Sequence, residues 1–324
     1  MTRPTSATSV TSSSLIDSAC HRQRRDRAAA DFAKYDFIKQ ATASRIADRL
    51  GLMRRRFPRV LDLGCHRGEV AQAIATTNKT DQIITADPSF NMAWRAKNAG
   101  YKPGHAERQA GRTDKQTRAS LVVDYDRLCF APNSFDALVS GFALHWVGDL
   151  PRLFATARQL LKADGLLLLC LAGGTSFAAL RACLATAETE IAGGLSPRVL
   201  PMADMRSLAD LLARAGFALP VADSETVTIT WDDAFAMMRD LRGMGESNAL
   251  AGRVRHFTRV GVLRRAAEIY QQRFSKGGKV EAEIELITLT GWVPDATQQQ
   301  PLAPGSGAVD LADALAGSGG GGGE

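Results

Sequence analysis

The sequence has no hydrophobic run long enough to cross a membrane. Its longest uninterrupted apolar stretch, LLLLCLA at residues 166–172, is far shorter than the ~20 residues that a spanning helix needs. It also has no C-x-x-C pair, and three of its five cysteines lie inside apolar runs, where cysteine usually packs as a small hydrophobic residue. These absences exclude a spanning helix, argue against structural zinc and indicate a reducing compartment.

Acidic residues are scarce in the N-terminal part of the chain. Residues 1–60 carry thirteen Lys and Arg against five Asp, a net charge of +8, so the remaining chain is net −2. A basic arm can bind nucleic acid, but arginine-rich solvated helices are common, and we expect no nucleic-acid partner. Residues 1–14 are rich in Ser and Thr and have no acid, which is typical of a disordered leader and is also similar to a mitochondrial presequence.

Short apolar strands alternate with amphipathic helices in the first half of the chain. The apolar runs predict strands at 59–64, 82–87, 120–124, 135–141 and 166–172. The segments between them predict helices at 67–76, 89–99 and 150–162, the last ended by KADG. The polar, basic residues 102–119 predict a surface loop. Such alternation predicts right-handed βαβ units around a parallel sheet.

After residue 175 the pattern becomes mainly helical. It predicts helices at 176–192, 204–215, 232–244 and 257–274 and strands at 225–231 and 281–291. The sequence therefore predicts an α/β fold, a doubly wound and mostly parallel sheet with a helical lid insertion. Its predicted parts are a disordered leader (1–14), an N-terminal helical arm (15–58), a Rossmann-like core (59–175), a helical insertion with C-terminal strands completing the same domain (176–292), and a flexible Gly-rich tail (293–324).

The segment VLDLGCHRGEVA, residues 60–71, lacks the middle glycine of the common G-x-G-x-G loop and has His66 there. Ligands of doubly wound sheets bind beyond the carboxyl ends of the strands, and Gly64 and Gly68 permit close approach and positive φ at that edge. His66 could contact the ligand, act as a base, or point to solvent from a left-handed position. We favour the last, because histidine enters that region more readily than most residues.

Acidic residues at the strand ends indicate which ligand binds. Asp87 ends the second predicted strand, twenty-three positions after Gly64, where the dinucleotide fold places an acid on the ribose hydroxyls. The loop lacks G-x-G-x-x-G, and Glu69 would repel a pyrophosphate, whereas Asp62 suits an ammonium or sulfonium group. The pattern therefore predicts S-adenosylmethionine (SAM) as the cofactor.

A third acid, Asp124, follows the third predicted strand in VVDYDRL. We predict that it accepts a hydrogen bond from the adenine amino group, with Tyr125 or Leu128 beside the ring. Each acid alone could be an ordinary turn residue at a strand end. Together with the glycines, the three acids favour a cofactor site.

These residues resemble the class I SAM-dependent methyltransferases. More narrowly, the chain resembles a branch shared by the malonyl carrier-protein methyltransferase of biotin synthesis and the complex I assembly factor 5 family. FDALVSGFALHWVGDLPRLF (135–154) resembles both groups, whereas residues 34–50, 180–201 and 238–250 resemble the assembly factor family and its bacterial relatives. The resemblance covers roughly residues 15–292.

The resemblance implies a seven-stranded Rossmann-like sheet and specific cofactor contacts. It places the SAM loop on Asp62, Gly64, Cys65 and Gly68, the ribose acid on Asp87 and the adenine-side acid on Asp124. The middle glycine of the family loop is replaced by His66.

For function, the resemblance implies a methyltransferase-like enzyme of respiratory complex I assembly that modifies a protein arginine. The family is associated with arginine hydroxylation, although its fold is that of methyltransferases, and fold alone does not settle the reaction. His145 is the predicted catalytic base, and Trp146 is predicted to line the substrate pocket or stack on a guanidinium. The alternative is that both residues only cap the fourth strand and pack on the next helix.

Two other functions stay open at this point. One is malonyl carrier-protein O-methyltransferase, and the other is a non-catalytic assembly chaperone that uses the basic N-terminal arm and RDLRGMGESNA (239–249) as its contact surface. His105 and Glu107 have the H-x-E spacing of an iron ligand pair, but they lie in the basic loop, and we predict no metal site. The expected partner is a protein substrate such as a complex I subunit. The location is the bacterial cytoplasm or the mitochondrial matrix, and the oligomeric state is open.

Overall fold

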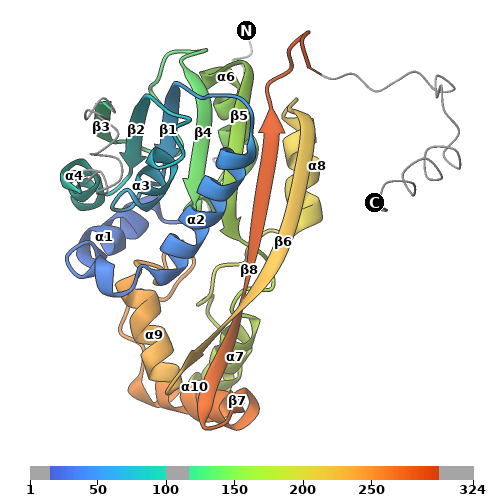
Figure 1. Ribbon diagram of the computed structural model, residues 1–324. Helices are drawn as coiled ribbons and strands as arrows, with labels where there is room; N and C mark the ends of the chain where they lie inside the picture. Colours follow the sequence, from blue (N-terminus) through green and yellow to red (C-terminus); the bar gives the residue numbers. More distant parts are fainter. Residues whose placement is uncertain (1–14, 100–116, 299–324) are drawn as a thin grey trace, which may run out of the picture.

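The computed structural model describes residues 15–99 and 117–298, and within these ranges the chain forms an eight-stranded sheet (Figure 1). The strand order is β3-β2-β1-β4-β5-β8-β6, with the two-residue β7 (Ser275–Lys276) paired to β8. The parallel strands are β1 (Arg59–Leu63), β2 (Gln82–Asp87), β3 (Thr117–Val122), β4 (Phe135–Gly141) and β5 (Leu161–Ala172). Antiparallel β8 (Lys279–Trp292) and β6 (Ala218–Trp231) complete the sheet. The predicted doubly wound, mostly parallel sheet is confirmed.

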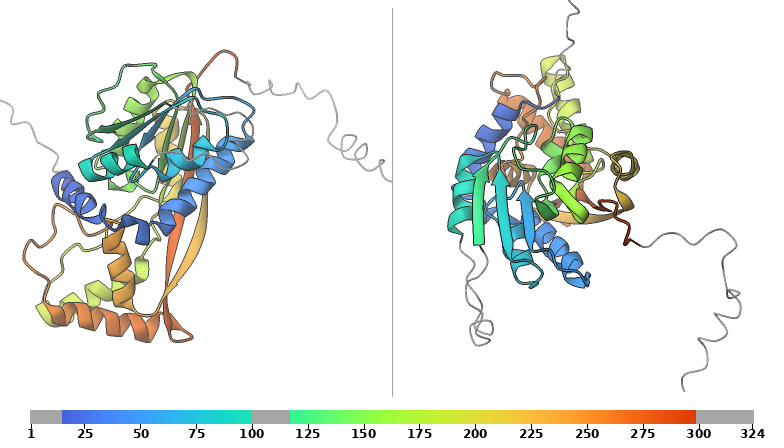
Figure 2. Two further views of the ribbon diagram at one scale, coloured as in Figure 1. Left: turned by 60° about the vertical axis from the view of Figure 1, so that its left-hand side comes forward. Right: turned by 90° about the horizontal axis from the view of Figure 1, so that it is seen from above.

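Alternate residues of each strand face opposite hydrophobic cores, as a period of two requires. On β1, Val60 belongs to the same core as residues of α2 (Phe37–Leu52) and α3 (Glu69–Ala75), whereas Leu61 belongs to the core that includes residues of α6 (Leu150–Leu160) and α8 (Met205–Arg214). The view from above in Figure 2 shows helices on both faces of the sheet. The central strands β1, β2 and β4 and most of β5 are therefore buried on both sides, which explains their nearly continuous apolar sequences.

Strands β1 and β4 are neighbours in the middle of the sheet, with β2 and β3 on the β1 side and β5 on the β4 side. The order of the strands therefore reverses between β1 and β4. This switch point is where doubly wound proteins bind ligands. Two N-terminal helices reach it: α1 (Ser18–Ala28) lies against α4 (Phe90–Asn98), and α2 packs against α3 and β4. The 3₁₀ turn η1 (Phe32–Lys34) connects α1 to α2.

Strands β6 and β8 are 14 residues long and extend well beyond the parallel strands (Figures 1 and 2). Ala172, the last residue of β5, pairs with Leu286, so residues 279–285 of β8 continue past the carboxyl end of β5. Helices α7 (Ala178–Ala192), α9 (Ala234–Gly243) and α10 (Val260–Arg273) pack around this extension. Helices α7, α9 and α10 of the segment predicted as an insertion therefore lie beyond the carboxyl end of β5, whereas α8 packs on the sheet with β6 and β8.

Some predicted boundaries were wrong. The third strand begins at Thr117 and ends at Val122, so the end of the predicted loop 102–119 belongs to β3 and Asp124 lies beyond it. KADG does not end a helix: α6 stops at Leu160, and these residues start β5 with Asp164 in a left-handed conformation (φ 55°). The rest of the predicted loop, including His105 and Glu107, lies outside the described residues, as do the leader and most of the tail.

No helix in the described ranges is both long enough and apolar enough to span a bilayer. All five cysteines are free thiols, and Cys65, Cys170 and Cys183 are buried. Burial raises the pKa of Cys170 to about 11, so this thiol stays protonated and packs as a small apolar group.

Candidate functional site

The loop after β1 adopts the tight, left-handed turn that its glycines permit. Gly64 and Gly68 have φ values of 76° and 90°. A Cβ on Gly64 would lie 2.3 Å from the Cβ of Ala143 and 2.7 Å from Tyr125 Oη. Because neither distance is sterically possible, only glycine fits where this loop meets the segment after β4.

Asp87, the predicted ribose acid, ends β2 with a fully buried side chain. Its Oδ1 accepts hydrogen bonds from the backbone N–H of Ser89 (2.9 Å) and from Arg25 Nε (3.2 Å). Its Oδ2 accepts from the backbone N–H of His66 (3.0 Å) and pairs with the second guanidinium nitrogen of Arg25. Both carboxylate oxygens are thus used within the chain, and Arg25 occupies the carboxylate that was predicted to bind the ribose.

Arg25 belongs to α1, and its side chain is buried, with 1% exposed. Burial opposes its charge, but the Asp87 carboxylate outweighs this effect, and the pKa of the guanidinium is raised. The guanidinium therefore keeps its positive charge at any physiological pH. Asp26, next in the sequence, accepts from Ser89 Oγ (2.5 Å) and the Asn91 backbone N–H (3.2 Å), which fixes α1 on the start of α4.

His66 has the expected positive φ, 51°, but the prediction that it points to solvent was wrong. It is 2% exposed and stacks on Phe32 of η1, with ring centroids 5.4 Å apart. Burial lowers the pKa of His66 well below its usual value, so the ring is neutral. The residue that replaces the family glycine therefore packs against the N-terminal helices.

Asp62 and Glu69 flank the same loop and are both buried. Asp62 Oδ2 accepts from the backbone N–H of Ala71 (3.1 Å) in α3. Glu69 accepts from the backbone N–H of Arg67 (3.0 Å), and burial raises its pKa to about 7. The repulsion of anions expected from Glu69 is consequently weaker than we assumed, because this carboxyl is partly protonated near neutral pH.

Asp124 and Tyr125 lie in the turn after β3. Asp124 is exposed, and its Oδ1 accepts from the backbone N–H of Asp126 (3.0 Å). Tyr125 is buried beside Gly64, and its hydroxyl has no hydrogen-bond partner within the described part of the chain. An unsatisfied buried hydroxyl is costly, so Tyr125 is a candidate ligand contact at the glycine loop.

A second polar cluster lies after β4, where η2 (Leu144–Trp146) carries both predicted substrate-side residues. Glu246, after α9, accepts from His145 Nε2 at 3.0 Å and from the indole N–H of Trp146. Its other oxygen pairs with Lys39 Nζ of α2, and Lys39 also donates to the carbonyl of Phe142 at 2.7 Å. We call Lys39, His145, Trp146 and Glu246 the Glu246 cluster.

The Glu246 cluster is almost completely buried. Burial disfavours the Glu246 carboxylate, but the Lys39 ammonium and the hydrogen bond from His145 overcome this and hold its pKa well below the usual range. Burial also lowers the pKa of Lys39 to about 8 and lowers that of His145. At neutral pH the cluster thus contains an ionised Glu246–Lys39 pair and a neutral imidazole. Trp146 stacks on His21 of α1, with ring centroids 4.9 Å apart.

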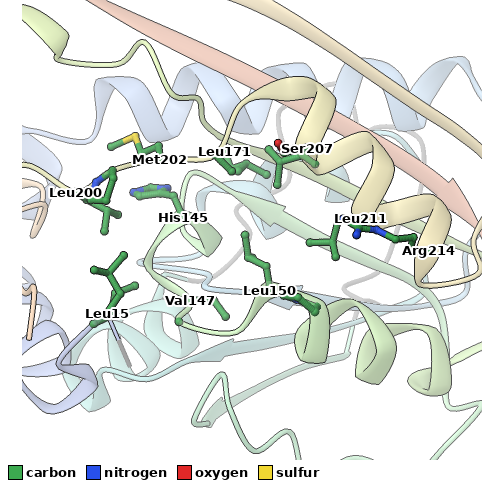
Figure 3. A pocket seen from close by; sticks show the side chains of 16 residues that line it. Leu15, His145, Val147, Leu150, Leu171, Leu200, Met202, Ser207, Leu211 and Arg214 are labelled. Carbon is green, nitrogen blue, oxygen red and sulfur yellow. The ribbon is translucent and has the colours of Figure 1, made fainter. Parts of the chain in front are cut away.

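A mostly apolar pocket of about 350 Å³ adjoins this cluster (Figure 3). His145 lies at one end beside Leu200 and Met202, and Leu211 and Arg214 of α8 lie at the other. The pocket is on the β5 side of the switch point, since Leu171 of β5 lines it. The candidate site therefore has two parts, a polar edge of the sheet at Asp87 and an apolar pocket at His145.

Sequence reasoning missed four residues of this site: His21, Arg25, Lys39 and Glu246. The excess of arginine before residue 60 was visible, but charge alone does not show that one arginine is buried. Glu246 lies inside the segment 238–250 that carried the resemblance, and this was the available signal. Among the described residues, no three His, Cys, Asp or Glu side chains are grouped as metal ligands.

Comparison with known proteins agrees with this architecture. The profile of the family described as "Methyltransferase domain" matches residues 27–220. This chain belongs to that family. It is therefore a methyltransferase-like enzyme, and its cofactor is SAM.

Two curated relatives of this methyltransferase-domain enzyme carry different names. The rat protein "Arginine-hydroxylase NDUFAF5, mitochondrial" (Rattus norvegicus) is 33% identical over 315 residues, which cover 96% of this chain and 86% of the relative. "Malonyl-[acyl-carrier protein] O-methyltransferase" of Methylovorus sp. is 31% identical over 287 residues, covering 89% and 93%. Both relatives span nearly the whole chain, including the helical insertion.

Solved structures show the same fold at low sequence identity. Phosphoethanolamine N-methyltransferase 2 of Haemonchus contortus, solved in complex with S-adenosyl-L-methionine, has a TM-score of 0.50 and 16% identity, covering 85% of this chain and 60% of that chain. This likeness concerns the sheet and its helices. The contacts of individual side chains with a cofactor stay predictions.

Proposed function

We propose that this enzyme modifies an arginine of a protein substrate during the assembly of respiratory complex I. The observation that carries the proposal is the 33% identity with arginine-hydroxylase NDUFAF5 over 96% of the chain. Trp146 of the Glu246 cluster supports it, because an indole ring can stack on a guanidinium. The bacterial cytoplasm is the proposed location, with the mitochondrial matrix as the alternative.

The residues at the Asp87 edge suit the cofactor in composition. Asp87 would take the ribose hydroxyls, Gly64 and Gly68 would admit the ligand to the backbone, and the hydroxyl of Tyr125 would gain a partner. Cys65, Asp62 and Asp124 complete the proposed set. Since Asp87 accepts four hydrogen bonds within the chain, Arg25 must leave Asp87 before a ribose can bind there.

Bound SAM supplies an electrophilic methyl group on a sulfonium. His145 is the proposed base, because it is neutral, buried and at the wall of the apolar pocket. Trp146 is the proposed wall for the substrate side chain. One face of its ring is already covered by His21, so a guanidinium would stack on the other face or displace His21.

A second candidate function is O-methylation of a malonyl carrier protein. The 31% identity with the Methylovorus enzyme favours it, and so does the apolar lining of the pocket, which suits an acyl chain. The contact surface proposed for the chaperone alternative is only partly exposed. Arg239 and Arg242 are exposed, whereas the Glu246 side chain is 8% exposed and Met244, Gly245 and Ala249 are buried.

Mass spectrometry of complex I separates these functions. The gene is deleted, complex I is isolated, and each arginine-containing peptide is compared with the wild type. Loss of an added oxygen atom supports arginine hydroxylation, and loss of an added methylene supports arginine methylation. An unchanged peptide set together with biotin auxotrophy would overturn the arginine proposal in favour of the carrier-protein enzyme.

A further inference from the structure

Glu246 joins three donors that come from separate parts of the chain. Its side chain is 8% exposed and accepts from Lys39 of α2 and from both His145 and Trp146 of η2. Backbone contacts also fix the segment that carries it, since Glu246 N–H donates to the carbonyl of Leu241 at 2.9 Å and Gly245 N–H donates to that of Arg242 at 3.1 Å. The carboxylate is therefore held in place before any substrate arrives.

The contact with Glu246 decides which nitrogen of His145 carries the proton. The carboxylate is ionised and can only accept, so Nε2 of the neutral ring must donate. Nδ1 is then left with a lone pair, and it is buried without a hydrogen-bond partner in the described ranges. The Phe142 ring packs edge to face on the imidazole of His145, with ring centroids 4.8 Å apart, and restricts the plane of the imidazole.

We propose that Glu246 is a positioning residue, which holds His145 in the Nε2-protonated tautomer so that Nδ1 is the atom that accepts a proton from the substrate. The same carboxylate fixes the indole of Trp146, so that base and pocket wall keep one relative orientation. This inference rests on the proposed role of His145. It adds that Nδ1 of His145 is the nitrogen that accepts the proton and that Glu246 is the residue that selects this nitrogen.

Lys39 has a separate role in this arrangement. It neutralises Glu246 and also binds the carbonyl of Phe142, which has a left-handed φ of 51°. Removing Glu246 alone would leave a buried cation unpaired, which is strongly destabilising. The test therefore uses Glu246→Gln both alone and combined with Lys39→Met, and the single Lys39→Met variant shows what the loss of the lysine does by itself.

The experiment is nitrogen-15 NMR of the full chain labelled at its five histidines, with the His145 signals identified by their loss in His145→Gln. In the wild type at pH 7, Nε2 is expected to show the shift of a protonated nitrogen and Nδ1 that of an unprotonated one. In Glu246→Gln the amide can donate to Nε2, so at least half of His145 is expected in the Nδ1-protonated tautomer. Glu268→Gln, an exposed change on α10, is the matched control and should change neither signal.

Circular dichroism must show that each variant is folded, and the Lys39→Met/Glu246→Gln pair serves if Glu246→Gln alone is not. A wild-type His145 protonated on Nδ1, or an unchanged tautomer in the folded Glu246 variants, would overturn the proposal. The readout needs no substrate, so it is independent of the proposed function. If complex I peptides show no arginine change while the tautomer shifts as expected, only the substrate assignment fails.

Once a substrate is in hand, kinetics add a second readout. Glu246→Gln is expected to lower kcat at least tenfold with KM within about twofold, because the wrong tautomer affects the proton-transfer step and not substrate binding. An equal rise in KM with kcat unchanged would assign Glu246 to substrate binding and contradict the positioning role.

Discussion

Asp87 and Glu246 are both buried carboxylates that face a basic side chain from the N-terminal helices, but they are held in different ways. Asp87 receives two backbone N–H donors, from His66 and Ser89, in addition to Arg25. Within residues 15–99 and 117–298, the donors to the Glu246 carboxylate are all side chains, those of Lys39, His145 and Trp146. The main chain therefore fixes the position of Asp87, whereas Glu246 fixes the positions of other side chains.

The difference indicates how each carboxylate can act. Asp87 keeps its two backbone donors when Arg25 leaves, so its carboxylate can exchange the arginine for a hydroxyl-bearing group and stay in the same position. Glu246 has no backbone donors of this kind among the described residues, and its loss would release the side chains of Lys39, His145 and Trp146 together. The first site is built for exchange of a partner, and the second for alignment.

The largest effect on stability is expected from Asp87→Ala. The change leaves Arg25 charged and buried without a partner, which costs about 3–5 kcal/mol of the free energy of unfolding. Urea denaturation followed by circular dichroism measures it. The double variant Arg25→Met/Asp87→Ala should recover most of the loss, and a double variant as unstable as the single one would contradict the importance of the ion pair.

Glu69 sharpens the comparison because it is a buried carboxyl whose pKa is raised to about 7, in contrast to Glu246. Between pH 4.5 and 7 the folded protein binds more protons at Glu69 than the unfolded chain does, so its contribution to stability falls as pH rises through this window. Relative to pH 4, Glu69→Gln should therefore gain roughly 3 kcal/mol over the wild type at pH 8.

Thermal or urea unfolding at several pH values checks this prediction. Glu268→Gln on the exposed surface of α10 is the control and should follow the wild type. A constant difference between Glu69→Gln and the wild type across the pH range would show that Glu69 titrates normally in the folded protein.

Arg25→Met tests whether Asp87 exchanges partners. Without the guanidinium, a ribose no longer has to displace a charged group, and we expect SAM to bind about tenfold more tightly, or about 1.4 kcal/mol. Calorimetric titration of Arg25→Met against Arg22→Met, an exposed change on the same helix, measures the effect. Weaker binding in Arg25→Met would mean that Arg25 itself holds the ligand.

The smallest effect is expected from His66→Gly. Glycine accepts the left-handed backbone at this position without strain, but the ring stack with Phe32, worth ~0.5–1.5 kcal/mol, is lost. We expect the stability to change by no more than about 1 kcal/mol, with SAM affinity unchanged or slightly higher. A large loss of affinity in calorimetry would show that the imidazole contacts the cofactor.

The sheet could be predicted from the sequence because buried parallel strands are short, apolar and bounded by turn residues. The first half of β6, residues 218–224, could not, since much of β6 is exposed and its polar residues obscure the pattern. The start of β3 at Thr117 was missed for a similar reason, because it follows a long polar segment.

The candidate site divides in the same way. Asp87 and Gly64 could be found because their spacing along the chain reflects the length of one strand–helix–strand unit. Arg25 and Lys39 could not, because each meets its carboxylate only after the N-terminal helices pack on the sheet, 62 and 207 positions away from its partner. The burial of His66 likewise depends on Phe32, which no local pattern relates to the loop.

The central claim is that SAM binds at the carboxyl edge of the sheet through Asp87. Calorimetric titration with SAM or its demethylated product tests it most directly, with Arg25→Met as the reference protein and Arg25→Met/Asp87→Ala as the variant, so that no buried arginine is left unpaired. We predict one ligand per chain for the wild type and the reference, and a loss of at least ~2 kcal/mol in the variant, because the ribose hydroxyls lose a charged acceptor. No heat with either ligand in folded wild-type protein, or equal affinity in reference and variant, would contradict the account.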